Sequence, residues 1–516
     1  MKQKIFPYDF APYYPVGVLP CPMYVDVANR VYERMKNVDL NLPNPGKLKK
    51  EIAINVAIYF EDKMSGIGLW NTFVAKHQLM YFHPLPFFDD FDALDKDDVN
   101  AKEVELLIWL VLSRNFDDRF LNPLAMGEDA ANLIMEVLTE EDEVEVTISA
   151  TAGKDRWTKG FVLDGVEHLF ADYPGSETLR LRAPIYNADK ANDYFKLKHV
   201  LIWLRRSYLL CSPLSEERFE EFKDSYLKQF NNGEATYYAE TSFIMRSEIG
   251  PLAVAPHLWL ADMYDENEMY SEGDKLKNLK YCQQDIFEVI EADSEYAVLK
   301  DSSDEVYRLK NVYPDVFHHG SFVCTALVKY GENEWEINGV VFNSHKDVYE
   351  RMHEHKTQLV VSYERAYPLY MERTKGKRLA FFENTNQLKG WLNMVSPELD
   401  MTEVCHRLPS GSQVAFISKK AGIVIAPGFV HAIKFKDNPY YGKCDARTIQ
   451  SETMDAVINI EATHPELLNY LLENNMLQDG DLSYSFPSEL GKEIFTRNID
   501  FIARNHRRHH YHDHDY

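Results

Sequence analysis

The sequence predicts an α+β protein that is rich in helix, has several domains and carries a small SH3-like or OB-like β-barrel in the middle. Its 516 residues suggest about three domains at roughly 150 residues each. Apolar residues recur at helical spacing toward both ends, whereas short alternating segments cluster between them. The expected organisation is a helical domain (1–140), a mixed α/β segment packed on it (141–275), the barrel (284–342), an α+β C-terminal domain (344–504) and a flexible His-rich tail (505–516).

The N-terminal domain is predicted to be helical because its apolar residues repeat every three or four positions. After an extended, ordered segment at 5–22, Tyr24, Val27, Val31 and Met35 follow this spacing. The stretch 104–112 is apolar on every side, so we expect a fully buried helix there. The helices expected in this domain are 24–35, 47–63, 70–81, 104–112 and 127–138.

The middle of the chain changes from helices to strands. A strand pair is expected at 144–148 and 157–162, followed by helices at 195–209 and 214–230. Five short segments then alternate between apolar and polar residues, with turn-rich links between them, as in a small closed barrel. These strands are expected at 285–291, 296–300, 305–309, 322–330 and 334–342.

The C-terminal domain is predicted to mix helices with a hairpin. Two apolar segments, Val414–Ile417 and Gly422–Ile425, lie on either side of Lys419-Lys420-Ala421. This pattern is typical of a β-hairpin. Thr463, Pro465 and Glu466 mark the start of a helix. The other elements expected here are a helix at 344–356, a strand at 378–383, a helix at 385–395 and a last helix at about 487–504.

Charge and cysteine content exclude several classes of partner. The net charge of −25 repels phosphate backbones and anionic lipids, so we expect neither nucleic acid nor membrane as a partner. The longest apolar run has seven residues, and no signal peptide is visible at the start, which predicts a cytoplasmic protein. The six cysteines lie at least 39 residues apart without any CxxC, so we expect neither a cysteine zinc site nor disulfides.

Local catalytic and metal motifs are missing from the sequence, and we expect no cofactor. Gly153-Lys154 lacks the other residues of a phosphate loop, no GxSxG occurs, and no register of the Asp-rich segment 89–98 fits an EF-hand. Glu350 and His353 form one ExxH, and in the ExxH from Glu461 to His464 the histidine starts a helix before Pro465, so the two residues cannot share a turn as the motifs of a di-iron bundle must. Any catalytic site would therefore be assembled only in three dimensions.

The candidate catalytic residues are Glu61, Asp62 and His77, which lie on consecutive predicted helices. Two antiparallel helices could bring a carboxylate to the imidazole, and such a pair can perform acid–base chemistry. His77 shares a helix face with Trp70 and Phe73, so a core histidine hydrogen-bonded to a carboxylate explains the same pattern.

Two further groups of residues suggest binding. Tyr296, Tyr307 and Trp335 are barrel aromatics that could contact a partner, although part of this set must fill the barrel core. The tail histidines could chelate Zn²⁺, Ni²⁺ or Cu²⁺ adventitiously if the tail is flexible, without forming a structural metal site. These tail residues are His506, His509, His510, His512 and His514.

Several phrases of the sequence resemble a known but uncharacterised family. They are IAINVAIYFEDKMSGIGLWNTFVAKHQLMYFHPLPFF and VNAKEVELLIWLVL near the start, then KFKDNPYYGKCDARTIQSETMDAVI, HPELLNYLLENNMLQDG and NIDFIARNHRR near the end. Together they are similar to a family of Bacteroidetes proteins catalogued as a domain of unknown function. The resemblance implies a bacterial, intracellular protein and carries no activity, ligand or catalytic residue with it.

Two hypotheses about function follow from these observations. In the first, the protein is a non-enzymatic interaction or regulatory protein whose barrel docks a peptide or protein. The segment 284–342 contains twelve acidic and only four basic side chains, and this excess of negative charge favours a basic partner. In the second, it is a hydrolase-like enzyme whose carboxylates and histidines converge only in the folded protein, since such sites are defined by geometry.

We predict that all six cysteines are free thiols. Their wide spacing and the expected reducing compartment both disfavour disulfides. Titration in denaturant without reductant should give six thiols per chain, with the fully reduced protein as the reference. Four thiols would reveal a disulfide and contradict the cytoplasmic assignment.

Overall fold

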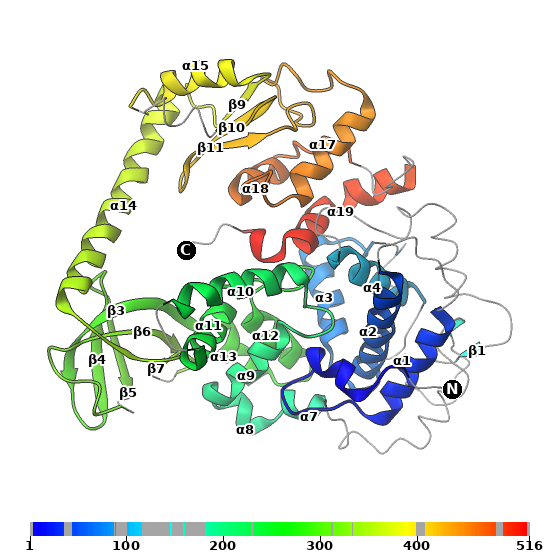
Figure 1. Ribbon diagram of the computed structural model, residues 1–516, viewed down its shortest axis with the longest axis vertical. Helices are drawn as coiled ribbons and strands as arrows, with labels where there is room; N and C mark the ends of the chain where they lie inside the picture. Colours follow the sequence, from blue (N-terminus) through cyan, green and yellow to red (C-terminus); the bar gives the residue numbers. More distant parts are fainter. Residues whose placement is uncertain are drawn as a thin grey trace. The chain divides into compact units, whose positions relative to one another are not determined.

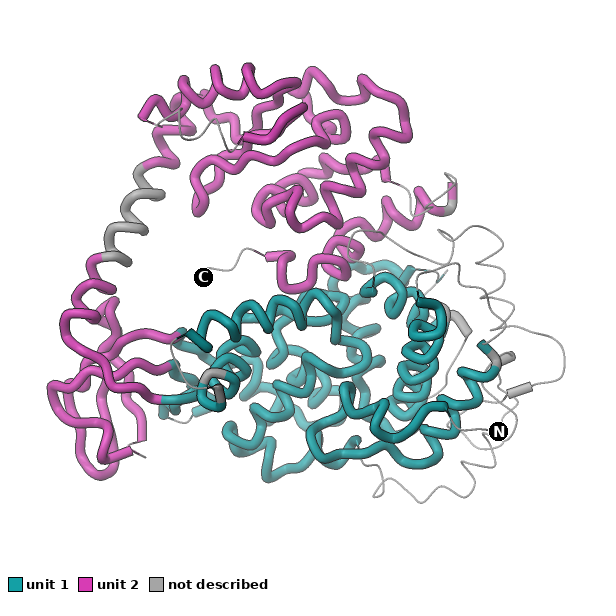
Figure 2. Tube along the Cα trace, in the orientation of Figure 1, with its two compact units in different colours: residues 1–283, 326–340, 482–487 teal, residues 284–325, 341–481, 488–516 magenta. Residues whose placement is uncertain are grey.

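The computed structural model describes most of the chain as two compact units (Figure 2). Unit 1 comprises residues 1–283, 326–340 and 482–487, and unit 2 comprises 284–325, 341–481 and 488–516. Each unit is considered by itself. The residues that the structure describes are 4–35, 44–86, 88, 101–115, 145–146, 158–159, 181–228, 232–310, 313–332, 334–398, 408–480 and 489–512.

Unit 1 begins with a short 3₁₀ helix, where the sequence predicted an extended segment, and continues with four α-helices that lie close to the predicted ones (Figure 1). Helix α2 ends at Gly66 (φ 64°), and Gly68 (φ 85°) precedes α3, so two glycines in left-handed conformation make the sharp turn between them. The predicted buried helix at 104–112 is confirmed, because its described side chains are at most 2% exposed. These elements are η1 (Pro7–Tyr13), α1 (Pro22–Met35), α2 (Pro45–Ser65), α3 (Leu69–Tyr81) and α4 (Ala101–Arg114).

More helices of unit 1 follow, and several of them were not expected from the sequence. The predicted helices at 195–209 and 214–230 correspond to α9 and α10, and the predicted strand pair is present as antiparallel β1 (Glu145–Val146) and β2 (Thr158–Lys159). The helix predicted at 127–138 lies outside the described residues. The helices of this stretch are α7 (Arg182–Ile185), α8 (Ala188–Ala191), α9 (Tyr194–Leu204), α10 (Pro213–Leu227), α11 (Asn232–Arg246), α12 (Pro256–Glu266) and α13 (Tyr270–Lys277).

The helices of unit 1 form one connected core. Helix α2 packs against α1, α3 and α4, while α12 contacts α3, α9, α11 and α13. Large aromatic side chains fill the interior, and Trp70, Trp109 and Trp259 are fully buried. Burial of these rings contributes much of the stability, at roughly 25 cal/mol per Å² of apolar surface.

The predicted small barrel is confirmed, and its strands lie close to the expected positions. The strand order is β3-β4-β5-β7-β6-β8, and a further pairing between β3 and β6 closes the barrel. Three consecutive strands followed by a hairpin that returns to the first strand is the connectivity of OB-like barrels, so OB-like fits better than SH3-like. The strands are β3 (Lys280–Ala292), β4 (Tyr296–Lys300), β5 (Val306–Lys310), β6 (Phe322–Lys329), β7 (Trp335–Ile337) and β8 (Phe342–Ser344).

The part of unit 2 that follows the barrel strands is built around a three-stranded antiparallel sheet with the order β11-β10-β9. Its central strand β10 is buried along its whole length, and α14, α15 and α18 contact it. Pairing of Ser418 with Gly422 closes the predicted hairpin. The elements are α14 (Lys346–Arg373), β9 (Leu379–Phe382), α15 (Thr385–Val395), β10 (Gln413–Ser418), β11 (Gly422–Pro427), α17 (Ala446–Ile458), α18 (Pro465–Glu473), α19 (Glu489–Arg507) and η4 (Arg508–His510).

The expectation of a flexible tail from residue 505 onward is wrong for the described residues up to 512. Helix α19 continues to Arg507 and a 3₁₀ turn follows, and Arg507, Arg508 and His509 are at most 2% exposed. The guanidinium of Arg507 donates hydrogen bonds to four backbone carbonyls, which anchors the chain end against α17 and the turn after it. These acceptors are Val457 (2.8 Å), Thr463 (2.9 Å), Ala456 (3.2 Å) and Asn459 (2.8 Å).

No helix in the described part of the chain combines the length and the apolar character that crossing a membrane requires.

We predict that Arg507→Met lowers the free energy of unfolding of unit 2 by about 3 kcal/mol, because it leaves four carbonyls without their donor in a buried site. Urea unfolding followed by circular dichroism measures the loss. The control is Arg351→Met, since the Arg351 side chain is 71% exposed and pairs only with its helix neighbour Asp347. Equal stability of the two variants would contradict the anchoring role.

Candidate functional site

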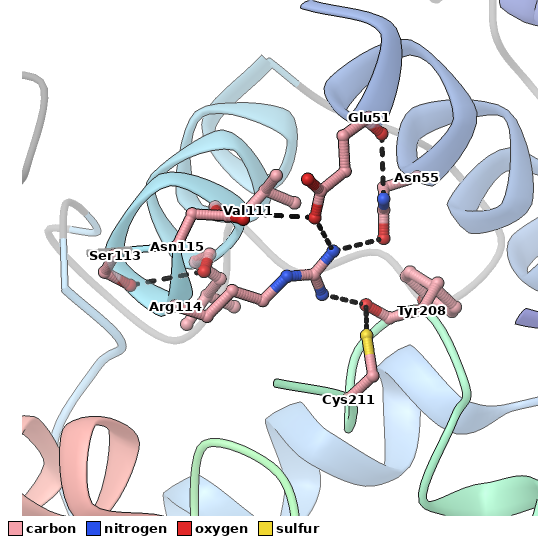
Figure 3. Close-up of polar contacts among 9 residues, drawn as sticks. Glu51, Asn55, Val111, Ser113, Arg114, Asn115, Tyr208 and Cys211 are labelled. Atoms are coloured by element: carbon pink, nitrogen blue, oxygen red, sulfur yellow. Dashed lines mark hydrogen bonds and ion pairs between the residues drawn. The ribbon is translucent and has the colours of Figure 1, made fainter. Parts of the chain in front are cut away.

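A buried arginine joins three segments of unit 1 (Figure 3). Arg114, the last residue of α4, donates to the Glu51 carboxylate (2.8 Å) and the Asn55 side chain (3.2 Å) on α2, and to the Tyr208 carbonyl (2.5 Å). Burial opposes the charge of Arg114, but Cys211 and Glu51 outweigh it and raise its pKa. The guanidinium is held by internal acceptors, which indicates a structural role.

Asp62, one of the predicted catalytic residues, caps the start of α3. Its Oδ1 accepts the backbone N–H groups of Gly68 (2.8 Å) and Leu69 (3.0 Å). Its Oδ2 accepts the N–H of Trp70 (2.7 Å) and the hydroxyl of Tyr208 (2.7 Å). Burial raises the pKa of Asp62, and these hydrogen bonds oppose that rise. Because both oxygens already accept two hydrogen bonds, Asp62 serves the fold.

Glu61 is the neighbouring predicted residue and has a different environment. It is fully buried, and its Oε2 accepts a hydrogen bond from the hydroxyl of Tyr14, next to η1. Its Oε1 has no hydrogen-bond partner among the described residues. Burial raises the pKa of Glu61 to about 8, and the Tyr14 hydroxyl opposes this rise. Glu61 is therefore protonated at neutral pH.

The third predicted residue, His77, lies among aromatic rings on α3. Its ring is near those of Phe73 (centroids 6.4 Å apart), Tyr81 (4.7 Å) and His83 (5.4 Å). Burial, and then the charge of His83, lower the pKa of His77 to about 3. The imidazole is thus neutral at physiological pH and a weak base, and its surroundings match the interpretation as a core histidine.

The barrel aromatics occupy different positions. Tyr296 is on the outer face of β4, where the Arg308 guanidinium lies 4.2 Å from its ring centroid. Tyr307 faces inward, with its ring 5.6 Å from that of Phe287 and its hydroxyl donating to Asp301 (3.0 Å). Trp335 is half-buried on β7. Tyr296 therefore lies on the outer surface of the barrel, and Tyr307 belongs to the barrel interior.

The tail histidines do not form a metal centre in the described part of the chain. His509 is buried, His506 and His510 belong to the helical end, and His512 is half-buried. Burial, then Arg508, lower the pKa of His506 to about 3. His514 lies outside the described residues. Within the described ranges no group of three His, Cys, Asp or Glu side chains is arranged to hold a metal ion.

A histidine–carboxylate pair in unit 2 was not expected from the sequence. His431 follows β11, and its Nδ1 lies 2.7 Å from Oε1 of Glu452 on α17, while its backbone N–H donates to Oε2 (2.9 Å). The His431 side chain is 27% exposed, so the imidazole is accessible. The two residues are 21 positions apart, without any motif. The available signal was a histidine in the loop after a predicted hairpin, since such loops often carry function.

The loop that carries His431 is held rigidly. Buried Asn438 donates to the carbonyls of Val430 (2.7 Å) and Ile433 (2.8 Å), and the N–H of Gly442 donates to the His431 carbonyl (3.2 Å). Phe429 has a φ of 38°, which is unfavourable for a bulky residue. Strain of this kind concentrates at functional sites because the surroundings must enforce it.

These features define an α+β protein with an OB-like barrel and an accessible histidine–carboxylate pair. The chain belongs to a family described as "Protein of unknown function (DUF3843)", whose model matches residues 4–158 and 335–508. The family resemblance expected from the sequence is confirmed to this extent. His431 and Glu452 lie within the matched ranges, whereas Tyr296 and Tyr307 lie between them. Comparisons with curated proteins and with solved structures gave no significant match.

We predict that Glu61→Gln reduces the pH dependence of stability. The folded pKa of Glu61, about 8, exceeds its ordinary value of 4.5, so the folded state binds more protons between these values. Its contribution to stability is therefore complete below about pH 4.5 and is lost as pH rises to about 8, by at most about 1.4 kcal/mol per pH unit.

Urea unfolding at pH 5, 6.5 and 8 tests this expectation. The wild type should lose more stability than Glu61→Gln over this range, and the exposed Glu217→Gln should follow the wild type. Parallel pH curves for wild type and Glu61→Gln would contradict the raised pKa.

Proposed function

We propose that the protein is an interaction protein that binds an extended, basic peptide segment of a partner on the outer face of β4 and β5. The proposal is carried by one observation: this face of the barrel joins an aromatic ring and exposed apolar side chains. Tyr296 and Val298 alternate outward on β4, and Val306 on β5 is 55% exposed. OB-like barrels commonly bind extended ligands on the corresponding face.

Charge complementarity supports a basic partner. The turn between β3 and β4 carries Asp293 and Glu295, and the turn between β4 and β5 carries Asp304 and Glu305, all at the ends of the proposed face. Backbone N–H groups of Tyr296 and Glu295 donate to Asp293 and lower its pKa, so its charge persists in mild acid. Basic side chains at the ends of a bound peptide would meet these carboxylates.

Two cations on the face, Lys300 and Arg308, are already engaged, which disfavours a nucleic acid. Lys300 pairs with Glu288 (3.3 Å) and Asp304 (3.4 Å), and the Arg308 guanidinium lies on the Tyr296 ring. Binding of a phosphate backbone requires a continuous line of available cations. Within the same proposal, the protein and its partner are located in the cytoplasm of a Bacteroidetes bacterium. No membrane takes part in the binding.

We predict that a labelled ten-residue peptide with alternating Lys and Val binds at micromolar concentration, as measured by fluorescence anisotropy. The analogue with Glu in place of Lys should not bind, because it meets acidic turns. Tyr296→Ala should weaken binding about tenfold, the scale of losing one aromatic contact.

The matched control is Tyr270→Ala, because Tyr270 is 60% exposed on α13 and outside the barrel. Single-stranded and duplex oligonucleotides at low salt provide the competing test. Tight oligonucleotide binding that weakens steeply with salt, or equal binding of the Lys and Glu peptides, would refute the proposal.

A further inference from the structure

The His431–Glu452 pair has the arrangement of a general base. The carboxylate accepts from both the Nδ1 position and the backbone N–H of the same residue, at 2.7 and 2.9 Å, so it fixes the imidazole ring. A carboxylate acceptor at Nδ1 requires the proton to be on Nδ1, which leaves the lone pair on Nε2. No hydrogen bond engages Nε2 among the described residues, and the ring is partly exposed.

The nucleophile that this base would activate is water. Cys444 is the nearest candidate in the sequence, but burial, then Glu452 and Asp445, raise the pKa of its thiol. A thiol that remains protonated is a poor nucleophile. A water molecule at Nε2 requires only the imidazole, and general-base catalysis of this kind typically contributes 10²–10⁴-fold in rate.

The charge of the loop that carries His431 indicates the substrate class. The loop 428–447 carries four exposed cations and two aspartates, in a chain whose net charge is −25. One aspartate, Asp437, pairs with Lys377 (2.9 Å), and the other, Asp445, caps α17 through the Thr448 N–H (3.0 Å). A local positive region in an acidic protein attracts anions. The four cations are Lys434, Lys436, Lys443 and Arg447.

We propose that His431 and Glu452 form a hydrolytic site for small carboxylic esters that carry a negative charge. His431 Nε2 removes a proton from water while the water oxygen bonds to the ester carbonyl carbon. The tetrahedral intermediate then expels the alkoxide, which takes the proton from Nε2, so the products are a carboxylic acid and an alcohol. Glu452 is a positioning residue that holds the ring and stabilises the imidazolium. This site goes beyond the docking proposal and is independent of it.

The test uses the full chain with 4-acetoxybenzoate and its neutral methyl ester, followed by absorbance of the released phenol. The wild type should hydrolyse the anionic ester with at least tenfold higher kcat/KM. His431→Asn retains an N–H donor for Glu452 but lacks the base, so kcat should fall at least tenfold for both esters. His318→Asn, which removes an exposed barrel histidine, is the matched control and should keep wild-type rates.

Two further variants separate catalysis from folding. Lys443→Gln changes an exposed side chain beside Gly442, and should raise KM for the anionic ester while leaving the neutral ester unchanged. Glu452→Gln should lower kcat for both esters while leaving both KM values unchanged, because the amide does not stabilise the imidazolium that forms during the reaction. The proposal is overturned if the wild type shows no hydrolysis above buffer, if His431→Asn keeps wild-type rates, or if Lys443→Gln leaves both KM values unchanged.

Discussion

The carboxylate of Asp62 is the contact on which the arrangement of unit 1 depends. It lies near the end of α2, receives the first backbone N–H groups of α3 and accepts the Tyr208 hydroxyl, so it joins three segments at one buried point. Burying a carboxylate is unfavourable unless its oxygens are hydrogen-bonded. Four donors meet that requirement, and they also set the direction in which α3 leaves the turn. Removal of this carboxylate would leave the donors of the helix start unsatisfied.

Unit 1 buries further polar groups around this point. Lys63 lies 3.5 Å from Glu103, which also accepts the Tyr59 hydroxyl, and Arg114 connects α4 with α2. Polar groups in a low-dielectric interior interact strongly, so each needs a defined partner. This requirement restricts how the helices can pack. It explains why Asp62 and Glu103 each accept hydrogen bonds from more than one element or side chain.

Unit 2 also contains polar side chains with defined partners. Some of them are buried at the end of the chain, and others are partly exposed at the surface. Arg507 binds four carbonyls and is itself shielded, and burial, opposed by Tyr511, lowers its pKa to about 9. His431 is the contrasting case, because its carboxylate partner holds one side of the ring while the other side remains accessible. A polar side chain hydrogen-bonded to defined acceptors thus anchors the chain end at Arg507, whereas at His431 it leaves a candidate reactive group accessible.

The helices near the start of the chain, the barrel and the hairpin were predictable from the sequence, because their apolar periodicities are local and strong. The strands at 285–291 and 296–300 and the helix at 385–395 were predicted within a few residues of the observed elements. Helices α11 to α13 were missed, because their apolar periodicity is weak and tertiary packing stabilises them. The folded structure was needed to see that Asp62 caps a helix, that Arg507 anchors the chain end and that His431 contacts Glu452. These pairs lie far apart in sequence or depend on burial, and no local pattern encodes the dielectric environment of a side chain or a partner brought in by folding.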